Sequence, residues 1–176
     1  PQMSSSKVYG KKPTRPHIDD YFMAMALLAS TRSTCQRRKV GCILVNEYNQ
    51  VLATGYNGVP KQRVHCIDSP CPGASSVSGK DLDECYAIHA EQNALLQCKD
   101  VSKIWTCYTT TAPCVTCVKL FLNTPATKIV FLKPYVTSNI SKMLWKESSR
   151  EWCQLTNHGL EEINNDIYRS LVSTKF

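Results

Sequence analysis

His89-Ala90-Glu91 and, further along the chain, Pro113-Cys114-Val115-Thr116-Cys117 are the stretches that decide how this sequence is interpreted. They offer one imidazole and two thiols, the ligands that a catalytic zinc takes when its fourth position stays open for water. Glu91 follows the histidine too closely to be an easy fourth ligand, but it is well placed to handle protons beside a metal. A Cys-x-x-Cys pair alone also occurs in redox and structural zinc sites, so the combination carries the specificity.

The spacing predicts that both stretches lie at helix starts. His89 and Glu91 would occupy the first turn of one helix, and Cys114 and Cys117 the first turn of the next. An i, i+3 pair at a helix start faces one direction, and the helix dipole there favours thiolate over thiol. Pro113 suits a helix entry because it needs no amide partner. The alternative is that Glu91 only complements the dipole and that the cysteines form a structural site.

Hydrophobic periodicity predicts strands and helices on either side of these stretches. A first helix starts at Asp19 or Asp20, with an apolar stripe formed by Tyr21, Met25 and Leu28. Residues 40–45 and 51–56 form a hairpin across the polar turn 46–50.

The later elements alternate in type. The predicted helices cover 86–99 (with Ile88, Leu95 and Leu96 as its apolar pattern), 114–122, 140–147 and 160–171, and the predicted strands cover 104–110, 128–132 and 152–155. An opening hairpin followed by alternating strands and helices predicts an α/β sandwich, in which helices flank a mixed β-sheet.

Composition fits one compact domain. The chain has 176 residues, 43% of them hydrophobic, and a net charge of +7. We expect a basic flexible N-terminal tail over 1–16 and a single domain over 17–176. The chain has no apolar run of about 18 residues and no signal-peptide core near its start, which predicts a cytoplasmic protein without a membrane segment.

Ten cysteines in a cytoplasmic protein indicate metal ligands and buried thiols rather than disulfides. Cys42, Cys98, Cys107 and Cys153 fall within strand or helix patterns, and we expect them to be small core residues. The loop over 60–85 is long for a compact domain and needs a tether. Five candidate ligands lie in or ahead of it: Cys35, His65, Cys66, Cys71 and Cys85.

The His-x-Glu and Pro-Cys-x-x-Cys pattern resembles that of zinc-dependent nucleobase deaminases. Four segments, 20–24, 39–45, 55–60 and 89–94, make the chain similar to deoxycytidylate (dCMP) deaminases in particular. The resemblance covers residues 18–135, and the Gly-Tyr-Asn-Gly-x-Pro element at 55–60 is its most specific part. It implies a cytidine-deaminase-like three-layer sandwich.

The resemblance also implies a reaction. His89, Cys114 and Cys117 would hold a catalytic zinc, whose hydroxide attacks C4 of the cytosine ring. Glu91 would take the water proton, deliver it to N3 and later protonate the departing amine. The products would be dUMP, a precursor for thymidylate synthesis, and ammonia.

Further roles follow from the same resemblance. Asn57 would hydrogen-bond the sugar, although a turn asparagine beside a glycine is the alternative. Tyr135 would lie near the phosphate, or else be an ordinary loop aromatic. The run at 37–39 favours a phosphate partner, and Lys39 or Arg37 would supply its positive charge.

Some dCMP deaminases carry a second, structural zinc in the region of the long loop. Cys35 and Cys66 fall at matching positions. Cys71 and Cys85 stand where other ligand types occur, and four thiolates would make a closed tetrahedral site, with His65 the main rival.

Regulation and assembly are implied as well. Many members form hexamers and bind deoxynucleoside triphosphates with Mg²⁺ at a separate site, where dCTP activates and dTTP inhibits. Gly58 and Asn93 are the matching candidates, although the residues alone favour a plain helix-face amide for Asn93.

Two other functions compete with this interpretation. A polynucleotide deaminase would share the zinc chemistry, but it needs stacking aromatics interleaved with basic residues along a groove. A non-enzymatic zinc-stabilised binding module would leave Glu91 without a purpose. We therefore expect a nucleotide substrate, deoxynucleoside triphosphate effectors and a homo-oligomer rather than a nucleic-acid or membrane partner.

Overall fold

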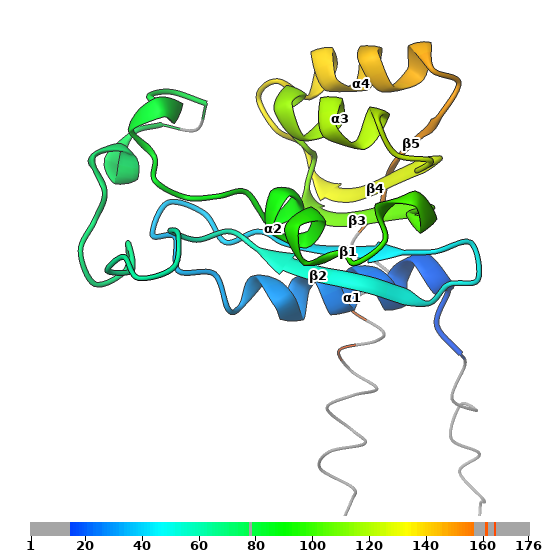
Figure 1. Cartoon of the computed structure of the whole chain (residues 1–176), viewed down its shortest axis with the longest axis horizontal. Helices are drawn as coiled ribbons and strands as arrows, with labels where there is room; N and C mark the ends of the chain where they lie inside the picture. Colours follow the sequence, from blue (N-terminus) through cyan, green and yellow to red (C-terminus); the bar gives the residue numbers. More distant parts are fainter. Residues whose placement is uncertain (1–14, 78, 157–160, 162–163, 165–176) are drawn as a thin grey trace, which may run out of the picture.

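Five strands form one mixed sheet in the computed structural model, which describes residues 15–77, 79–156, 161 and 164 (Figure 1). The strands are β1 (Gly41–Val45), β2 (Val51–Tyr56), β3 (Thr106–Thr111), β4 (Lys128–Lys133) and β5 (Glu151–Gln154), in the spatial order β2-β1-β3-β4-β5. β1 pairs antiparallel with β2 and β3, whereas β3, β4 and β5 run parallel. The predicted mixed α/β sheet is confirmed.

Helices cover both faces of this sheet (Figure 1). Helix α1 (Ile18–Ser30) lies on one face, and α2 (Ala90–Gln97), α3 (Val115–Leu122) and α4 (Ser138–Glu147) lie on the other. Side chains alternate along β1 accordingly: Cys42 and Leu44 pack in the core on the α2–α4 side, and Ile43 and Val45 in the core on the α1 side. The fold is therefore a three-layer sandwich.

Local chemistry explains the connections. In the β1–β2 turn, Asn46 Oδ1 accepts hydrogen bonds from the backbone N–H groups of Tyr48 (3.0 Å) and Gln50 (2.9 Å). The parallel strands need crossovers, and α3 and α4 supply them between β3, β4 and β5. The connection between β2 and α2 projects beyond one end of the sheet (Figure 1). It contains the short 3-10 helices η1 (Pro72–Ser75) and η2 (Leu82–Glu84), and a third, η3 (Val101–Lys103), precedes β3.

The predicted helix over 86–99 starts four residues later, at Ala90. The reason is a β-bridge between Ile88 and Gly58, in which each backbone N–H donates to the other carbonyl at 2.9 and 3.2 Å. Residues ahead of His89 therefore stay extended.

The predicted apolar stripe of α1 is not its buried face. Tyr21 and Leu28 are 48% and 71% exposed, while Phe22, Met23 and Ala26 are buried together with Asp19. Asp19 is buried because Lys128 Nζ and Tyr108 OH donate to its carboxylate at 2.8 and 2.7 Å. Helix α1 thus packs through the face that carries Phe22 and Met23, where this ion pair also lies, and not through the predicted stripe.

Helix α2 also departs from its predicted pattern. Leu96 is 76% exposed, and the helix buries Ala90, Glu91 and Ala94 instead. A Cβ on Gly55 of β2 would lie 2.2 Å from the Ala90 carbonyl oxygen. The helix and the strand approach so closely that only small residues fit between them.

Several predictions fall at the edges of the described chain. The predicted tail over 1–16 and the predicted helix over 160–171 lie outside it, apart from residues 15, 16, 161 and 164. None of the helices within the described ranges is long and apolar enough to cross a membrane. The ten cysteines are all free thiols; Cys42 and Cys107 are fully buried as expected, whereas Cys98 and Cys153 are only partly buried.

Candidate active site

A pocket opens where four strands present an end at the same edge of the sheet. β1 begins at this edge and β2 ends there, with Gly41 paired to Tyr56, while β3 and β4 both end there, with Thr111 paired to Lys133. Carboxyl ends of parallel strands are a favoured place for ligands in α/β folds. The cavity measures about 220 Å³, and its lining includes Arg37, Arg38, Val40, Asn57, His89, Glu91, Ala112, Cys114 and Tyr135.

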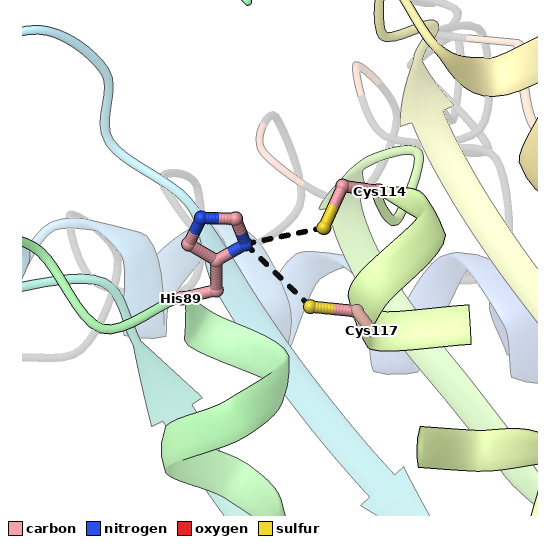
Figure 2. A group of neighbouring side chains, drawn as sticks. All are labelled: His89, Cys114 and Cys117. Atoms are coloured by element: carbon pink, nitrogen blue, oxygen red, sulfur yellow. Dashed lines mark hydrogen bonds between the residues drawn. The ribbon is translucent and has the colours of Figure 1, made fainter. Parts of the chain in front are cut away.

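Three candidate metal ligands meet at this pocket (Figure 2). Figure 2 shows the His89 ring turned so that Nδ1 faces both cysteines, and Nδ1 lies 3.5 Å from the sulfur of Cys114 and 3.5 Å from that of Cys117. A tetrahedral zinc with bond lengths of ~2.3 Å to sulfur and ~2.0 Å to nitrogen separates these atoms by about 3.5 Å. The three side chains therefore fit a zinc ion.

Two helix starts bring these ligands together, as the sequence predicts. His89 and Cys114 are the N-cap residues of α2 and α3, both with extended backbone, and Cys117 lies one turn into α3. The side chain of Gln92 accepts a hydrogen bond from the His89 backbone N–H at 2.9 Å, which closes the start of α2.

The thiols have unequal proton affinities. A hydrogen bond from the Cys117 thiol, together with His89, lowers the pKa of Cys114 to about 4. The same hydrogen bond raises the pKa of Cys117, and burial raises it further. The charge of a divalent cation would favour the thiolate form of both, since a metal deprotonates the thiols that coordinate it.

Glu91 lies in the first turn of α2, buried at 4% exposure, and lines the same pocket. Burial raises its pKa to about 7, against the opposing influence of His89. A carboxyl group whose pKa lies near neutrality can both accept and release a proton, which suits a general acid and base. This environment agrees with the role that the sequence predicts for Glu91.

Asn57 lines the pocket and is buried, and both ends of its side-chain amide make hydrogen bonds within the protein. Its Oδ1 accepts hydrogen bonds from the Val40 N–H (2.8 Å) and the Ser33 hydroxyl (2.7 Å), and its Nδ2 donates to the Arg38 carbonyl (2.8 Å). Asn57 therefore holds the segment that precedes β1, a role that sequence alone did not suggest.

The three residues of the basic run at 37–39 do not all lie in the pocket. Arg37 and Arg38 both line the pocket, whereas Lys39 is exposed and is absent from the lining. The Arg38 guanidinium lies over the Tyr135 ring, 5.4 Å from its centroid. Arg38 was not a separate candidate in the sequence. Its place in the basic run at 37–39 was the feature that pointed to it.

Two cysteines of the long loop form a close pair. The sulfur atoms of Cys66 and Cys71 lie 3.7 Å apart, Cys35 is buried, and Cys85 is half-buried. Among the described residues, however, three ligand atoms lie within 4.8 Å of one another only in the His89 group. The rival ligand, His65, is exposed and faces Asp68, with Nδ1 3.9 Å from Oδ2.

The two candidate effector residues lie near each other but outside the pocket lining. Asn93 Nδ2 donates to the Tyr56 carbonyl at 2.8 Å, and Gly58 forms the bridge with Ile88. Both residues therefore join the end of β2 to the start of α2.

Ligand set, buried carboxyl and pocket together define a zinc site of the catalytic type. Residues 16–133 match the family described as the cytidine and deoxycytidylate deaminase zinc-binding region. This chain belongs to that family, as its resemblance in sequence predicts.

Known relatives agree with this assignment. The chain is 49% identical over 107 residues to a deoxycytidylate deaminase of Schizosaccharomyces pombe, covering 58% of this chain and 33% of the relative. It is 41% identical over 123 residues to the deoxycytidylate deaminase of Saccharomyces cerevisiae, covering 69% and 39%. This chain thus spans between a third and two fifths of the length of these relatives.

A solved structure matches most of this chain. The dCMP deaminase of cyanophage S-TIM5, crystallised in complex with dCMP and dUMP, is 26% identical to this chain with a TM-score of 0.66. The match covers 81% of this chain and 100% of the phage chain.

Proposed function

We propose that this chain catalyses the hydrolytic deamination of dCMP to dUMP and ammonia. The observation that carries the proposal is the meeting of His89, Cys114 and Cys117 beside the buried Glu91 in one pocket. The names of the relatives, and the nucleotides bound to the phage enzyme, favour dCMP as the substrate.

Zinc, when bound by the three ligands, lowers the pKa of water to about 7 and so supplies hydroxide at neutral pH. Glu91 accepts a proton as water adds to C4 of the cytosine ring, and it returns that proton to N3. It next takes the remaining proton from the hydroxyl group now on C4 and gives it to the exocyclic amine as the C4–N bond breaks, so that one water is consumed and one ammonia is released. The raised pKa of Glu91 suits both halves of this cycle, because neither protonation state is strongly disfavoured near pH 7.

The pocket favours a single nucleotide over a polynucleotide. Tyr135 is the one aromatic residue in the lining of this pocket, as far as the described chain shows it. Binding of single strands uses several aromatic platforms for successive bases.

A turnover assay with dCMP, deoxycytidine and single-stranded DNA tests the proposal directly. Release of ammonia from dCMP, with little from single-stranded DNA, is the expected result. Turnover of the DNA at a rate equal to or above that of dCMP would favour the polynucleotide function instead.

A second, structural zinc held by Cys35, Cys66, Cys71 and Cys85 is part of the same proposal. Burial disfavours the Cys66 thiolate, but hydrogen bonds from the backbone of Cys71 and Gln36 outweigh it and lower its pKa. The backbone of Tyr86 likewise bonds the Cys71 sulfur. Because Gln36 and Tyr86 follow Cys35 and Cys85 directly, these contacts bring all four cysteines to one neighbourhood.

Allosteric control by dCTP as activator and dTTP as inhibitor, each with Mg²⁺, also belongs to the proposal. The supporting observation is that the contacts of Gly58 and Asn93 connect the end of β2 to the start of α2, the helix whose start carries His89 and Glu91. An effector bound there would act on the catalytic helix through its first turn. We further propose a homo-oligomer, a hexamer by analogy with the family.

A further inference from the structure

β2 forms one edge of the sheet, and its sequence lacks the usual protection against pairing with another strand. Val51–Tyr56 contains no charged residue and no proline, whereas β5, at the other edge, begins at Glu151. Charged side chains and prolines are common devices that keep an edge strand from pairing. The β2 edge is therefore open to a further strand, as far as the described chain shows it.

The ladder with β1 shows which backbone groups of β2 face outward. One step beyond the paired residues, the Asn57 N–H donates to the Val40 carbonyl at 3.2 Å. Bonded and non-bonded pairs alternate along an antiparallel ladder, and this one is regular over the last four residues of β2. The N–H and C=O groups of Thr54 and Tyr56 consequently point away from β1. In agreement, the Tyr56 carbonyl accepts a hydrogen bond from Nδ2 of Asn93.

Helix α1 has an apolar flank that is open to solvent. Asp19, Asp20 and Ser30 are its polar residues, and all the others are apolar or aromatic. A helix that is apolar on all sides is normally buried on all sides. Tyr21 and Leu28, which we call the α1 flank, are nevertheless 48% and 71% exposed.

The α1 flank faces the β2 edge. Asp19 lies on the side of α1 toward β4, where its carboxylate accepts a hydrogen bond from Lys128 Nζ at 2.8 Å. At about 100° per residue, Tyr21 and Leu28 lie about 160–180° around the helix from Asp19. Because β1 and β3 separate β2 from β4, this opposite side of the helix is the side toward β2.

The side chains of Thr54 and Tyr56 lie on the same face of the sheet as α1. Tyr56 is paired with Gly41, and Gly41 faces α1, since a Cβ there would lie 1.9 Å from the Ala26 carbonyl oxygen. Both Thr54 and Tyr56 are exposed. The β2 edge and the α1 flank adjoin (Figure 1), and none of their four exposed side chains is charged.

We propose that this surface binds a second copy of the chain, with the two β2 strands paired antiparallel about a two-fold axis near Thr54. The outward N–H and C=O groups of Thr54 then bond those of its copy, and the two sheets join into one. The same axis places both α1 flanks on one face of the joined sheet, with the Thr54 and Tyr56 side chains between them.

Charge and coverage both favour a second copy as the occupant. A two-fold axis brings each residue near it to its own copy, so a charge there would face a like charge. In a chain with a net charge of +7, a surface without charges suits such a contact. A strand from another protein could pair with the edge, but it would leave the α1 flank exposed. The inference rests on the proposed homo-oligomer and not on the proposed deamination.

The mass of the full chain in solution tests the proposal. Leu28→Glu places a charge on the α1 flank, and Met143→Glu is the matched control, because Met143 is 53% exposed on α4, on the other face of the sheet. In sedimentation velocity over a range of concentrations, the wild type should contain at least two chains of 19.8 kDa. Burial of an unpaired carboxylate should raise the dissociation constant of Leu28→Glu at least about 10-fold, and Met143→Glu should resemble the wild type.

Hydrogen exchange tests the strand pairing itself. The Thr54 amide should exchange slowly in the assembled wild type and much faster in Leu28→Glu, because the edge then returns to solvent. Circular dichroism should show the same fold and Tm in dilute Leu28→Glu and dilute wild type, since Leu28 is exposed in the single chain.

Three outcomes would overturn the proposal. They are a wild type that stays monomeric at all concentrations, fast exchange of the Thr54 amide in an assembled wild type, and equal dissociation in Leu28→Glu and Met143→Glu. Neither measurement uses a substrate, so failure of the proposed deamination would show separately, as an assembled wild type that does not turn over dCMP.

Discussion

Gly55→Ala is the substitution through which the packing of this fold and its site can be tested together. A methyl group at Gly55 would lie 2.2 Å from the Ala90 carbonyl oxygen, 2.5 Å from the Ala94 amide nitrogen and 2.9 Å from the Ala94 Cβ. Two of these atoms are helix backbone, so α2 as a whole has to move away from β2.

Overpacking of this kind costs typically about 1–3 kcal/mol, and a clash with backbone places Gly55→Ala at the upper end. Alanine regains about 0.4–1 kcal/mol by restricting the unfolded chain. We therefore expect a net loss of about 2 kcal/mol in the free energy of unfolding, or roughly 4–8 °C in Tm for a chain of this length. Circular dichroism during thermal and urea unfolding measures both quantities.

Gly41→Ala is a matched control on the opposite face. Its methyl group would lie 1.9 Å from the Ala26 carbonyl oxygen and 2.6 Å from the Ser30 amide nitrogen, and so displaces α1 rather than α2. Both variants should lose stability, but only Gly55→Ala should also weaken zinc binding in competition with a chromogenic chelator, because α2 carries His89. A Gly55→Ala protein as stable as the wild type would refute the reasoning, as would equal zinc affinities in the two variants.

Three further predictions concern other parts of the molecule. Burial alone would raise the pKa of Asp19, but the hydrogen bonds that it accepts from Lys128 and Tyr108 lower this pKa in the folded protein. The stability that ionised Asp19 contributes is therefore present above the unfolded pKa of about 3.9, and it is lost as the pH falls through the lower folded pKa. Lys128→Met should therefore cost about 1–3 kcal/mol at pH 7 in urea unfolding, and the gap to the wild type should narrow below about pH 4; a gap independent of pH would contradict the role of the ion pair. Metal analysis of protein purified without chelator should find two zinc ions per chain, and Cys66→Ser should lose one of them and lower Tm; a single zinc with unchanged Tm would remove the structural site. In rate curves for dCMP, dTTP should increase sigmoidicity and dCTP should reduce it, whereas Asn93→Ala should blunt both effects; purely competitive inhibition by dTTP would refute the separate site.

The elements and the metal ligands were predictable because their signals are local. Val40 to Val45 is an apolar run of strand length beside a polar turn, and the Cys-x-x-Cys spacing places two thiols on one side of a helix start. Such patterns need no knowledge of distant residues, and the structure contains both the hairpin and the site.

The buried faces of the helices were not predictable in the same way. Leu28 is a large apolar residue on a helix, yet it is exposed, because α1 packs through the face of Phe22 and Met23, where Asp19 also pairs with a lysine 109 residues away in the sequence. Helix α2 buries alanines rather than Leu96 because β2 approaches it at a glycine. Apolar periodicity allows more than one buried face on these helices, and which face is buried depends on contacts with residues far away in the sequence.

Within the pocket, the sequence indicated which segments line it but not the contacts that each side chain makes. It pointed to the run at 37–39, but only the structure separates Arg38, over the Tyr135 ring, from the exposed Lys39. It pointed to Asn57, but not to the three hydrogen bonds that the side chain of this residue makes with the segment ahead of β1. Such distinctions depend on side-chain directions in an irregular segment, which no local pattern specifies.

The central claim is that Glu91, beside a zinc held by His89, Cys114 and Cys117, moves the protons in the hydrolysis of dCMP. The most direct measurement is the rate of ammonia release from dCMP by the wild type and by Glu91→Gln, with the zinc content and Tm of both proteins determined on the same samples. The amide has the shape of the carboxyl group but cannot shuttle a proton, so Glu91→Gln should keep its zinc and its fold and lose at least about 100-fold in kcat. A Glu91→Gln protein that holds zinc and retains more than a tenth of the wild-type rate would contradict this account.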